Sequence, residues 1–435
     1  MNTIWENDVR MPAFGSLQGN VRTDVLIIGG GLAGLLCAQS LTRAGIDCML
    51  IEENRLMSGV SGRTTAKLTS QHGLVYDKIL RRYGAEKALL YWEANEDAIA
   101  TFCALVEEID CDFERKDHYL FTTGDIQKLE REAEAYEKLG IPAKWCSQLA
   151  LPFPVTGALC FTNQAQFHPL KFAAHIAKNL KVYEDTKALA FDGKCVQTPN
   201  GKITAEKIIV ATHFPMFNKH GGYFLKLYQQ RSYVLALDTG AEIDGMYLED
   251  KENGLSLRSA GNYLLLGGGG HRTGMRGRCW DLPEDVAKKY YPKAKEVARW
   301  ATQDCMSLDA IPYIGQYSKA TPDLYVATGF HKWGMSSSMV AAMILTDMVQ
   351  GRENPYGQVF APSRTVLHRQ TVVNGVEAAA NLLCLRKPRC PHLGCALKWN
   401  DREHSWDCPC HGSRFDENGK RRDGPASGDL PEQKQ

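Results

Sequence analysis

The pattern of apolar and polar positions near the start of the chain predicts a strand, a helix and a second strand. Residues 25–28 form a short apolar run of the kind found in strands that are buried on both faces. Residues 32–44 carry apolar side chains at helical spacing, and Gly45 suits the position just past a helix C-terminus. Another apolar run at 48–51 predicts the next strand. This order is typical of an α/β sheet.

The next part of the chain predicts further helices. Residues 85–109 alternate between apolar and charged positions at helical period, so we expect a long helix with one solvent-exposed face. Residues 125–139 are heavily charged, and we interpret them as a solvated surface helix. Residues 170–180 predict another helix.

The second half of the chain returns to the first sheet and adds another one. Residues 207–212 and 324–328 predict buried strands, the first of which brings the chain back to the first sheet. Runs such as 232–238 and 262–266 imply an antiparallel sheet that forms a second layer. The four glycines at 267–270 predict a strand end where the backbone passes close to another group.

Length, composition and charge narrow the class of protein. A chain of 435 residues suggests two or three domains, and 44% hydrophobic with 23% charged residues is ordinary for a globular protein. A net charge of +1 does not indicate binding to nucleic acid or to an anionic membrane. The charged N-terminus does not resemble a signal peptide, and no apolar run reaches the roughly 18 residues of a membrane span. We therefore expect a cytoplasmic enzyme.

A glycine motif follows the first strand. Gly29, Gly31 and Gly34 have the G-x-G-x-x-G spacing, in which the first glycine permits a tight turn and the second lets the backbone approach a pyrophosphate. The third lets the next helix lie close on the strand. Glu52 follows at the end of the second strand, where a carboxylate can accept hydrogen bonds from both hydroxyls of an adenosine ribose. Glycine-rich turns also occur for packing reasons alone, but the whole order predicts a dinucleotide site.

Two later segments are expected to contact the same cofactor. Residues 58–74 combine small residues with the basic Arg63 and Lys67, which suits a loop beside a phosphate or an electron-rich ring. A solvated loop is the alternative. After the last predicted strand, Ser336 or Ser337 is expected to cap a helix whose N-terminal dipole stabilises negative charge.

The C-terminal residues contain the most specific motif. Cys390-x-His392 is followed, after fifteen intervening residues, by Cys408-x-x-His411. Two thiolates and two neutral imidazoles fit the two irons of a [2Fe–2S] cluster. The alternative is a structural zinc site, because Zn²⁺ also binds two cysteines and two histidines. Ten other cysteines scatter through the first 384 residues without a repeating spacing.

The chain resembles the D-amino-acid-oxidase family of FAD enzymes, which includes glycine, sarcosine and γ-glutamylputrescine oxidases. The resemblance rests on the glycine motif, the SGR loop at 61–63, the IIVAT strand at 208–212 and the ATGF turn at 327–330 before a helix. It spans about residues 22–352. It implies FAD with Glu52 on the ribose, the glycines on the pyrophosphate and the last helix near the flavin pyrimidine.

The resemblance also implies a reaction and a set of site residues. Such enzymes transfer a hydride from an amine carbon to the flavin, and water hydrolyses the imine that results. The expected cofactor-binding residues are Gly29, Gly31, Leu32, Ala33, Gly34, Glu52, Glu53, Ser61, Gly62, Arg63, Thr65, Lys67, Val182, Ala211, Thr212, Gly329, Gly334, Met335 and Ser336. The catalytic candidates on the substrate side are Arg231, Tyr233, Arg258, His331 and Lys332. We expect the FAD to be bound non-covalently.

The C-terminal motif resembles a Rieske domain of the disulfide-bearing type. The similarity lies in the CPHLGC and CPCHGS loops and in the GPA sequence at 424–426, which matches the loop that covers the cluster in that family. It implies a [2Fe–2S] cluster held by Cys390, His392, Cys408 and His411, and a disulfide between Cys395 and Cys410. The approach to the first ligand is short, and residues 372–385 offer at most one hairpin.

We therefore expect an α/β (α+β) architecture. Residues 1–355 form the FAD-dependent oxidoreductase, in which an antiparallel-sheet substrate domain is inserted into a Rossmann-type FAD-binding domain. Residues 360–435 form a small, shortened, β-rich Rieske domain. The FAD-binding parts are expected at about 22–80, 150–212 and 311–352, and the substrate-domain parts at about 81–149 and 213–310.

The expected function is that of a dehydrogenase. Two electrons pass from a small amine or amino acid to FAD, and then leave singly through the cluster to an external electron carrier. One alternative is an amine oxidase that uses O₂, with a tail that serves as a structural zinc or disulfide module. A second alternative is a reductase, in which electrons pass from an outside donor through the cluster to the flavin. In a third alternative the protein is not an enzyme, and the tail docks a partner as a zinc or disulfide module.

Overall fold

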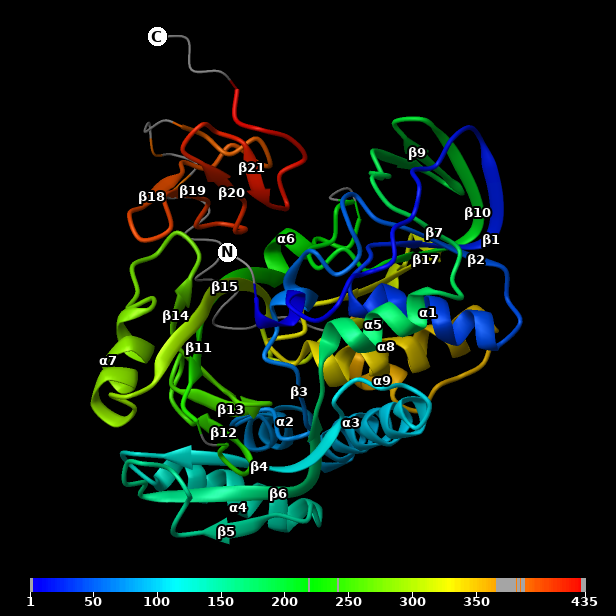
Figure 1. Cartoon of the computed structure of the whole chain (residues 1–435). Coiled ribbons are helices and arrows are strands. Elements are labelled where there is room, and N and C mark those ends of the chain that lie inside the picture. Colours follow the sequence, from blue (N-terminus) through cyan, green and yellow to red (C-terminus); the bar gives the residue numbers. More distant parts are fainter. Residues whose placement is uncertain are drawn as a thin grey trace.

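The computed structural model of the chain describes residues 3–217, 220–240, 242–364, 381, 384 and 388–431. They form two large sheets, the helices that cover them and a small third sheet near the C-terminus (Figure 1). No helix within these ranges is long and apolar enough to cross a membrane.

The first sheet is built on β1 (Val21–Ile28), which pairs in parallel with β2 (Cys48–Ile51) and β10 (Gly201–Val210). The strand order is β16, β17, β10, β1, β2 and β7, with β9 attached to β10 and β8 to β9. The other strands of this sheet are β7 (Val182–Tyr183), β8 (Ala190–Asp192), β9 (Cys195–Thr198), β16 (Tyr313–Ser318) and β17 (Thr321–Thr328). The predicted strands at 25–28 and 48–51 are confirmed.

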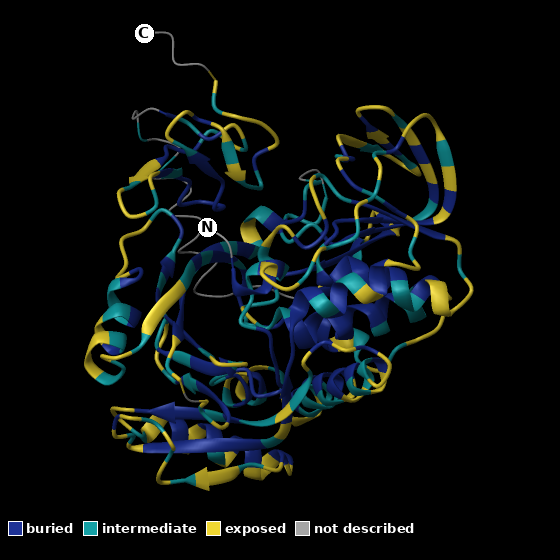
Figure 2. Cartoon of the chain, in the orientation of Figure 1, coloured by how far each residue is buried: buried dark blue, intermediate teal, exposed yellow. Residues whose placement is uncertain are grey.

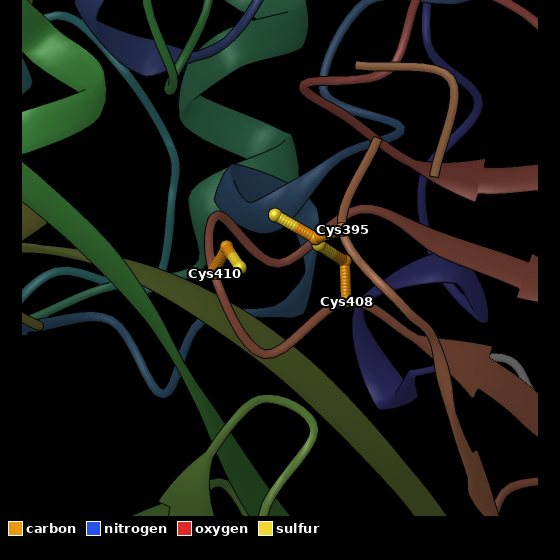
Figure 3. Close-up of side chains that lie close together, drawn as sticks. All are labelled: Cys395, Cys408 and Cys410. Atoms are coloured by element: carbon orange, nitrogen blue, oxygen red, sulfur yellow. The ribbon is translucent and has the colours of Figure 1, made fainter. Parts of the chain in front are cut away.

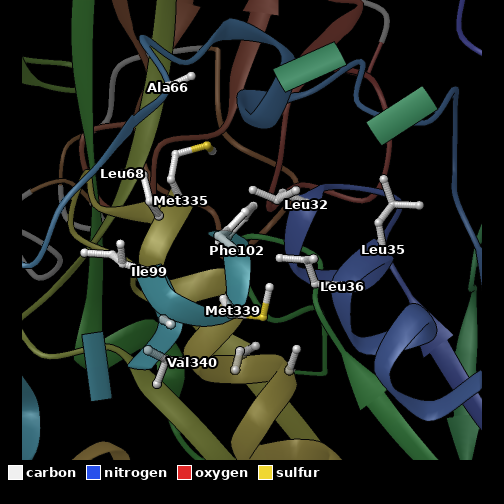
Figure 4. Close-up of a cluster of buried hydrophobic side chains, with 14 of the residues drawn as sticks. Leu32, Leu35, Leu36, Ala66, Leu68, Ile99, Phe102, Met335, Met339 and Val340 are labelled. Atoms are coloured by element: carbon white, nitrogen blue, oxygen red, sulfur yellow. The ribbon is translucent and has the colours of Figure 1, made fainter. Parts of the chain in front are cut away.

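Apolar helices pack against the first sheet. The helices α1 (Leu32–Arg43), α5 (Pro169–Ala177) and α8 (Gly334–Val349) lie side by side there (Figure 1), and α3 (Ala85–Val106) packs on α8. Figure 4 shows Leu36 of α1, Phe102 of α3 and Met339 of α8 in one buried cluster. Buried residues are concentrated in α1, α8 and the strands of both large sheets (Figure 2). This packing fixes the N-termini of α1 and α8 at one edge of the sheet.

The second sheet forms the other layer, in the order β15, β11, β14, β13, β12, β4, β6 and β3, with β5 paired to β6. Its strands are β3 (Lys67–Leu68), β4 (Glu114–Thr122), β5 (Lys144–Cys146), β6 (Gly157–Gln166), β11 (Leu227–Asp238), β12 (Met246–Glu249), β13 (Ser256–Ala260), β14 (Tyr263–Arg272) and β15 (Lys295–Ser307). All pairs are antiparallel except β4 with β12. The sheet therefore also takes β3 and β6 from segments that we assigned to the FAD-binding parts.

The remaining elements are short or lie at the edges of these layers. They are η1 (Ile4–Glu6), η2 (Val60–Arg63), α2 (Tyr76–Tyr83), α4 (Gln127–Leu139), α6 (Tyr223–Lys226), α7 (Asp281–Tyr290) and α9 (Gly357–Phe360). The interpretation of α4 as a solvated surface helix is only partly right, because one face is buried and contains Leu129, Ala135, Tyr136, Leu139 and the charged Glu132. Its carboxylate accepts hydrogen bonds from the backbone N–H groups of Tyr76 and Asp77 at 2.8 and 3.1 Å, which caps α2.

Two local predictions need correction. Helix α8 begins at Gly334 with Trp333 as its N-cap, so Ser336 and Ser337 lie inside the first turn and do not cap the helix. The glycines at 267–270 lie inside β14, not at its end. The close approach predicted for them is confirmed, since a Cβ on Gly269 would lie 2.0 Å from a backbone oxygen of Cys279.

The third sheet belongs to the C-terminal domain, by which we mean the described residues 388–431. It is fully antiparallel, in the order β18 (Lys398–Asn400), β19 (Ser405–Asp407), β20 (Arg414–Asp416) and β21 (Arg421–Asp423). The hairpin considered at 372–385 lies almost entirely outside the described residues. The domain sits beside β14, β15 and α6 (Figure 1).

Candidate active site and metal centre

A cavity of about 1650 Å³ lies where the two large sheets and the C-terminal domain meet. The residues that follow β1, β2, β10 and β17 line one side, and β11, β14 and β15 contribute to the other. Residues 421–427 of the C-terminal domain also line it. Ligands of open α/β sheets bind outside the carboxyl ends of the strands, which is where this cavity lies.

The glycine turn at the start of α1 has no room for side chains. Gly29 has a φ of +115°, and a Cβ there would lie 2.5 Å from the carbonyl oxygen of Ala211. A Cβ on Gly34 would lie 1.9 Å from the carbonyl oxygen of Gly29. The hydroxyl of Ser61 accepts a hydrogen bond from the backbone N–H of Leu32 at 3.0 Å, which ties the SGR loop to α1. The turn thus leaves the N-terminus of α1 open for a pyrophosphate.

Glu52 stands beside this turn at the end of β2. Its Oε2 accepts a hydrogen bond from the backbone N–H of Gly30 at 2.6 Å, and its Oε1 accepts one from Asn54 at 2.9 Å. Burial raises the pKa of Glu52 above its usual value, while the two backbone hydrogen bonds act in the opposite direction. The carboxylate is therefore held in place beside the glycine turn, and its contact with a ribose stays a prediction.

Most of the predicted cofactor-binding residues line this one cavity. They are Gly29, Gly31, Leu32, Ala33, Glu52, Glu53, Ser61, Arg63, Thr65, Lys67, Ala211, Thr212, Gly329, Gly334 and Met335. The structure thus brings together segments that are separated by up to about 300 residues in the sequence.

Gly34, Gly62, Val182 and Ser336 do not line the cavity. The two glycines allow close backbone packing, since a Cβ on Gly62 would lie 2.3 Å from a backbone oxygen. Val182 pairs in β7, and the hydroxyl of Ser336 lies 3.1 Å from Nε2 of His72. These four residues support the walls of the site and do not face it.

Lys67 is a buried amine in the cavity wall. Its Nζ donates hydrogen bonds to the carbonyl oxygen of Tyr247 at 2.6 Å and to the hydroxyl of Ser256 at 2.8 Å. Burial, together with the nearby charge of Arg258, lowers the pKa of Lys67 well below its usual value.

Of the catalytic candidates, Tyr233, His331 and Lys332 line the cavity. His331 and Lys332 have φ values of +52° and +74°, a backbone conformation that residues with a Cβ rarely adopt and that is enriched at active sites. The hydroxyl of Tyr233 donates a hydrogen bond to Oε1 of Glu403 at 2.8 Å. Their catalytic role stays a prediction.

The two arginine candidates do not line the cavity. Arg231 is 2% exposed, and its Nε donates a hydrogen bond to Oε1 of Glu403 in the C-terminal domain at 2.9 Å. Arg258 is equally buried, and its guanidinium lies 5.3 Å from the ring of Trp5. The structure therefore places Arg231 at the domain interface and Arg258 in the core, because each has its contacts there.

The sequence analysis did not single out three residues of the cavity wall. The ring of His72 stacks on Trp333 with centroids 4.6 Å apart, and burial lowers the pKa of His72 to about 3, so the imidazole is neutral. Asp304 on β15 accepts a hydrogen bond at Oδ2 from the hydroxyl of Ser232 at 2.8 Å. Asp304 follows Thr302 and Gln303 in the sequence, and no local pattern there marks it as a site residue.

The metal motif lies on two loops of the C-terminal domain. The first is closed by a hydrogen bond from the backbone N–H of Gly394 to the carbonyl oxygen of Cys390 at 2.9 Å, and the second by the same contact between Gly412 and Cys408. The backbone N–H of Ala426 donates to Oγ of Ser413 at 3.0 Å. The GPA loop therefore lies against the second metal loop, as the resemblance implies.

The four predicted metal ligands meet in two pairs. The side chains of Cys390 and Cys408 interact with each other, and both are buried. The imidazole rings of His392 and His411 have centroids 4.9 Å apart and planes at 88°. A pair of thiolates beside a pair of imidazoles is the division that a [2Fe–2S] cluster with two different irons requires.

The protonation of the histidines suits metal binding. Burial lowers the pKa of His392 and of His411 to about 4, which leaves both imidazoles neutral at pH 7. Nε2 of His411 lies 3.1 Å from the carbonyl oxygen of Phe224, to which it donates a hydrogen bond. Nδ1 of His411 is buried and has no hydrogen-bond partner among the described residues. The carbonyl group thus fixes the tautomer in which Nδ1 keeps its lone pair for a metal.

The other two cysteines of the loops lie close by. The sulfur atoms of Cys395, Cys408 and Cys410 are within 4.8 Å of one another (Figure 3). Every described cysteine is a free thiol in the structure. The pairing of Cys395 with Cys410 therefore stays a prediction, which their proximity supports.

A buried charge network, the Glu403 network, ties the C-terminal domain to the second sheet. Glu403 pairs with Arg231 of β11 and, at 2.9 Å, with Arg414 of β20. Arg414 also pairs with Asp407 at 2.9 Å and with Asp423 at 3.1 Å. Burial alone would raise the pKa of Glu403, but the charges of Arg231 and Arg414 lower this pKa to about 2. The carboxylate is therefore ionised at neutral pH.

Further contacts place the metal loops at the cavity. Nε2 of Gln303 on β15 donates a hydrogen bond to the carbonyl oxygen of Gly412 at 2.8 Å. Glu53, at the end of β2, pairs with Arg421 of β21. The C-terminal domain is thus joined to both large sheets.

The cavity and the paired metal loops define the class of the protein, an oxidoreductase of the flavoprotein type joined to an iron–sulfur domain. The chain belongs to the FAD dependent oxidoreductase family, whose match covers residues 24–348. Residues 349–434 match the Rieske [2Fe-2S] domain. The cofactors are accordingly FAD and a [2Fe–2S] cluster, and the open glycine turn and the free Nδ1 of His411 fit them.

Known proteins of both kinds are similar to the chain. The putative Rieske 2Fe-2S iron-sulfur protein YhfW of Bacillus subtilis (strain 168) is 36% identical, over 98% of this chain and 96% of its own length. Gamma-glutamylputrescine oxidoreductase of Escherichia coli (strain K12) is 25% identical, over 78% of this chain and 86% of its own. The crystal structure of glycine oxidase from Geobacillus kaustophilus shares the fold, with a TM-score of 0.68 and 20% identity over 79% of this chain and 99% of that one.

Proposed function

We propose that the chain is a dehydrogenase that oxidises the CH–NH group of a small amine or amino acid, and that the electrons leave singly through the Rieske cluster to an external carrier. Bound FAD would supply the hydride acceptor and the cluster a one-electron acceptor. Gamma-glutamylputrescine oxidoreductase and glycine oxidase, by their names, act on an amine and an amino acid, which supports this substrate class. We also expect the protein to be cytoplasmic.

The observation that carries the proposal is the shared cavity. His392 of the first metal loop lines the same cavity as Gly31 of the glycine turn and Met335 of α8. A cluster ligand in the wall of the expected flavin cavity suits electron transfer between the two cofactors within one chain. A tail that served only as a structural clamp would not need a metal ligand in the cavity wall.

The polar groups of the cavity support an amine substrate. Asp304, oriented by the hydroxyl of Ser232, is a carboxylate that suits a protonated amine. His72 and Trp333 provide a neutral, flat wall on which a small organic group packs. Tyr233, His331 and Lys332 remain the candidates for positioning the reacting carbon.

Anaerobic spectroscopy with metal analysis tests the proposal. Freshly purified protein is expected to contain FAD and iron, and an amine substrate should bleach the flavin and then produce the EPR signal of a reduced histidine-ligated cluster. Turnover with an artificial one-electron acceptor should exceed O₂ consumption. Flavin with zinc in place of iron, or electrons that return only to O₂, would contradict the proposal and favour an amine oxidase with a structural tail.

A further inference from the structure

Both histidines of the metal motif pack against one phenylalanine, Phe214, which follows strand β10 of the first sheet. The ring centroid of Phe214 lies 6.1 Å from that of His392 and 6.1 Å from that of His411, with interplanar angles of 83° and 71°. Edge-to-face contacts of this kind favour one relative orientation of the rings. Phe214 is 4% exposed, so its ring has little freedom to move.

Phe214 belongs to the turn that forms the cofactor cavity. It stands two residues after Thr212, whose hydroxyl donates a hydrogen bond to the carbonyl oxygen of Phe214 at 2.9 Å. The same turn touches the glycine turn, since a Cβ on Gly29 would lie 2.5 Å from the carbonyl oxygen of Ala211. A short covalent segment thus connects the expected pyrophosphate site with the ring that holds the histidines.

The two histidines differ in their relation to the cavity. His392 and Phe214 both line it, whereas His411 does not. His411 is 5% exposed, and its Nε2 already donates to the carbonyl oxygen of Phe224. His392 is therefore the ligand of the motif that reaches the flavin side.

We propose that Phe214 is a positioning residue for electron transfer: it holds His392 in the wall of the flavin cavity, so that electrons enter the cluster through this ligand. The inference rests on the proposed function, since it takes the flavin as the donor. In each transfer one electron leaves the reduced flavin and one ferric ion of the cluster becomes ferrous. The external one-electron carrier later takes up that electron.

The test compares variants of two phenylalanines in the full-length holoprotein. Phe214→Ala and Phe214→Leu remove the ring, and Phe214→Leu keeps an apolar side chain in case the smaller residue disturbs folding. Phe224→Leu is the matched control, because the Phe224 ring contacts only His411 of the two histidines, with centroids 6.2 Å apart, and does not line the cavity. The substitution keeps the backbone carbonyl that accepts the hydrogen bond from His411. FAD and iron content confirm that each variant is loaded.

The readout is the rate at which the cluster is reduced after rapid photoreduction of the flavin without oxygen. We expect this rate to fall about tenfold in both Phe214 variants, a barrier change of about 1.4 kcal/mol, and to stay near that of the unaltered protein in Phe224→Leu. Reduction of the flavin by substrate should fall much less than transfer to the cluster in the same variants, which separates positioning of His392 from a general loss of structure.

Two results would overturn the inference in distinguishable ways. If electrons pass from flavin to cluster equally fast in the unaltered protein and in Phe214→Leu, the role of Phe214 is refuted and the proposed function stays intact. No transfer from flavin to cluster in the unaltered protein would refute the proposed function and this inference with it.

Discussion

At the scale of single residues, burial decides which polar groups of the cavity carry charge. His72 is 6% exposed, and burial lowers its pKa to about 3, so it offers an uncharged ring at neutral pH. Asp304 is only half-buried and has the hydroxyl of Ser232 beside it. The wall of the cavity thus combines a neutral imidazole with an oriented carboxylate.

The first prediction concerns Asp304. In Asp304→Asn the negative charge that would hold a protonated amine is lost, and a hydrogen bond to a charged group contributes about 1.5–3 kcal/mol, so KM should rise by roughly 10- to 100-fold. The maximal rate of flavin reduction should change much less. Steady-state kinetics with a small amine measure both.

Glu252→Gln is the control for Asp304→Asn, because Glu252 also lines the cavity but is exposed. It should leave KM almost unchanged. Equal effects of the two substitutions would show that Asp304 acts only through the overall charge of the cavity.

At the scale of elements, the Glu403 network joins β11 of the second sheet to β20 of the third. Arg231, Arg414 and Glu403 have side chains that are 3–8% exposed. Removing one partner of such a buried pair leaves an uncompensated charge, which costs more than the pair itself contributes. The position of the C-terminal domain therefore depends on this network.

The second prediction concerns the stability of the interface. Glu403→Gln should lower the free energy of unfolding at pH 7 by about 3 kcal/mol, because Arg231 and Arg414 lose their shared carboxylate. Urea unfolding, followed by the visible circular dichroism of the cluster, measures the change. Glu417→Gln, at an exposed position of the same domain, should have almost no effect.

The contribution of Glu403 to the free energy of unfolding should depend on pH. The pKa of Glu403 is about 2 in the folded protein, below its value in the unfolded chain, so its stabilisation is complete above about pH 5 and is lost as the pH falls towards 2. Between pH 5 and 3.5 the unaltered protein should lose stability more steeply than Glu403→Gln. Parallel curves would contradict this assignment.

At the scale of the whole molecule, the C-terminal domain forms part of the wall of the cavity that contains the glycine turn. Residues 421–427 and His392 line the cavity together with the glycine turn. The two expected cofactor sites belong to separate domains, and of the four expected cluster ligands only His392 lines the cavity that contains the glycine turn. This arrangement suits electron transfer within a single chain.

The third prediction separates the two cofactors. Cys408→Ser removes one predicted iron ligand, so the protein should lose its iron and keep its FAD. Substrate should still reduce the flavin, but reduction of the one-electron acceptor should fall to background. Iron analysis, flavin absorbance and anaerobic reduction measure these three effects.

Cys195→Ser is the control for Cys408→Ser, since Cys195 is a half-buried cysteine of β9 outside the metal loops. It should keep iron, FAD and both activities. Acceptor reduction that survives the loss of iron in Cys408→Ser would show that the electrons leave the flavin by another way.

Local chemistry in the sequence determined a large part of this protein. The apolar runs and the spacing of Gly29, Gly31 and Gly34 specify a strand, a turn and a helix, because a turn this tight excludes side chains. The Cys-x-His and Cys-x-x-His spacing likewise specifies the metal loops, because each loop closes on itself with backbone hydrogen bonds. Such features depend on neighbours in the sequence and are visible in it.

Only the tertiary structure decided how distant segments meet. In the sequence Arg231 looks like a substrate-binding residue, but it pairs with Glu403, which lies 172 residues further on. Phe214 follows a strand, and nothing around it in the sequence indicates that the fold packs its ring against His392 and His411. The contacts of Asp304 with Ser232 and of His72 with Trp333 were decided in the same way. Long-range burial and pairing decide the charge and contacts of a side chain, and no local pattern encodes them.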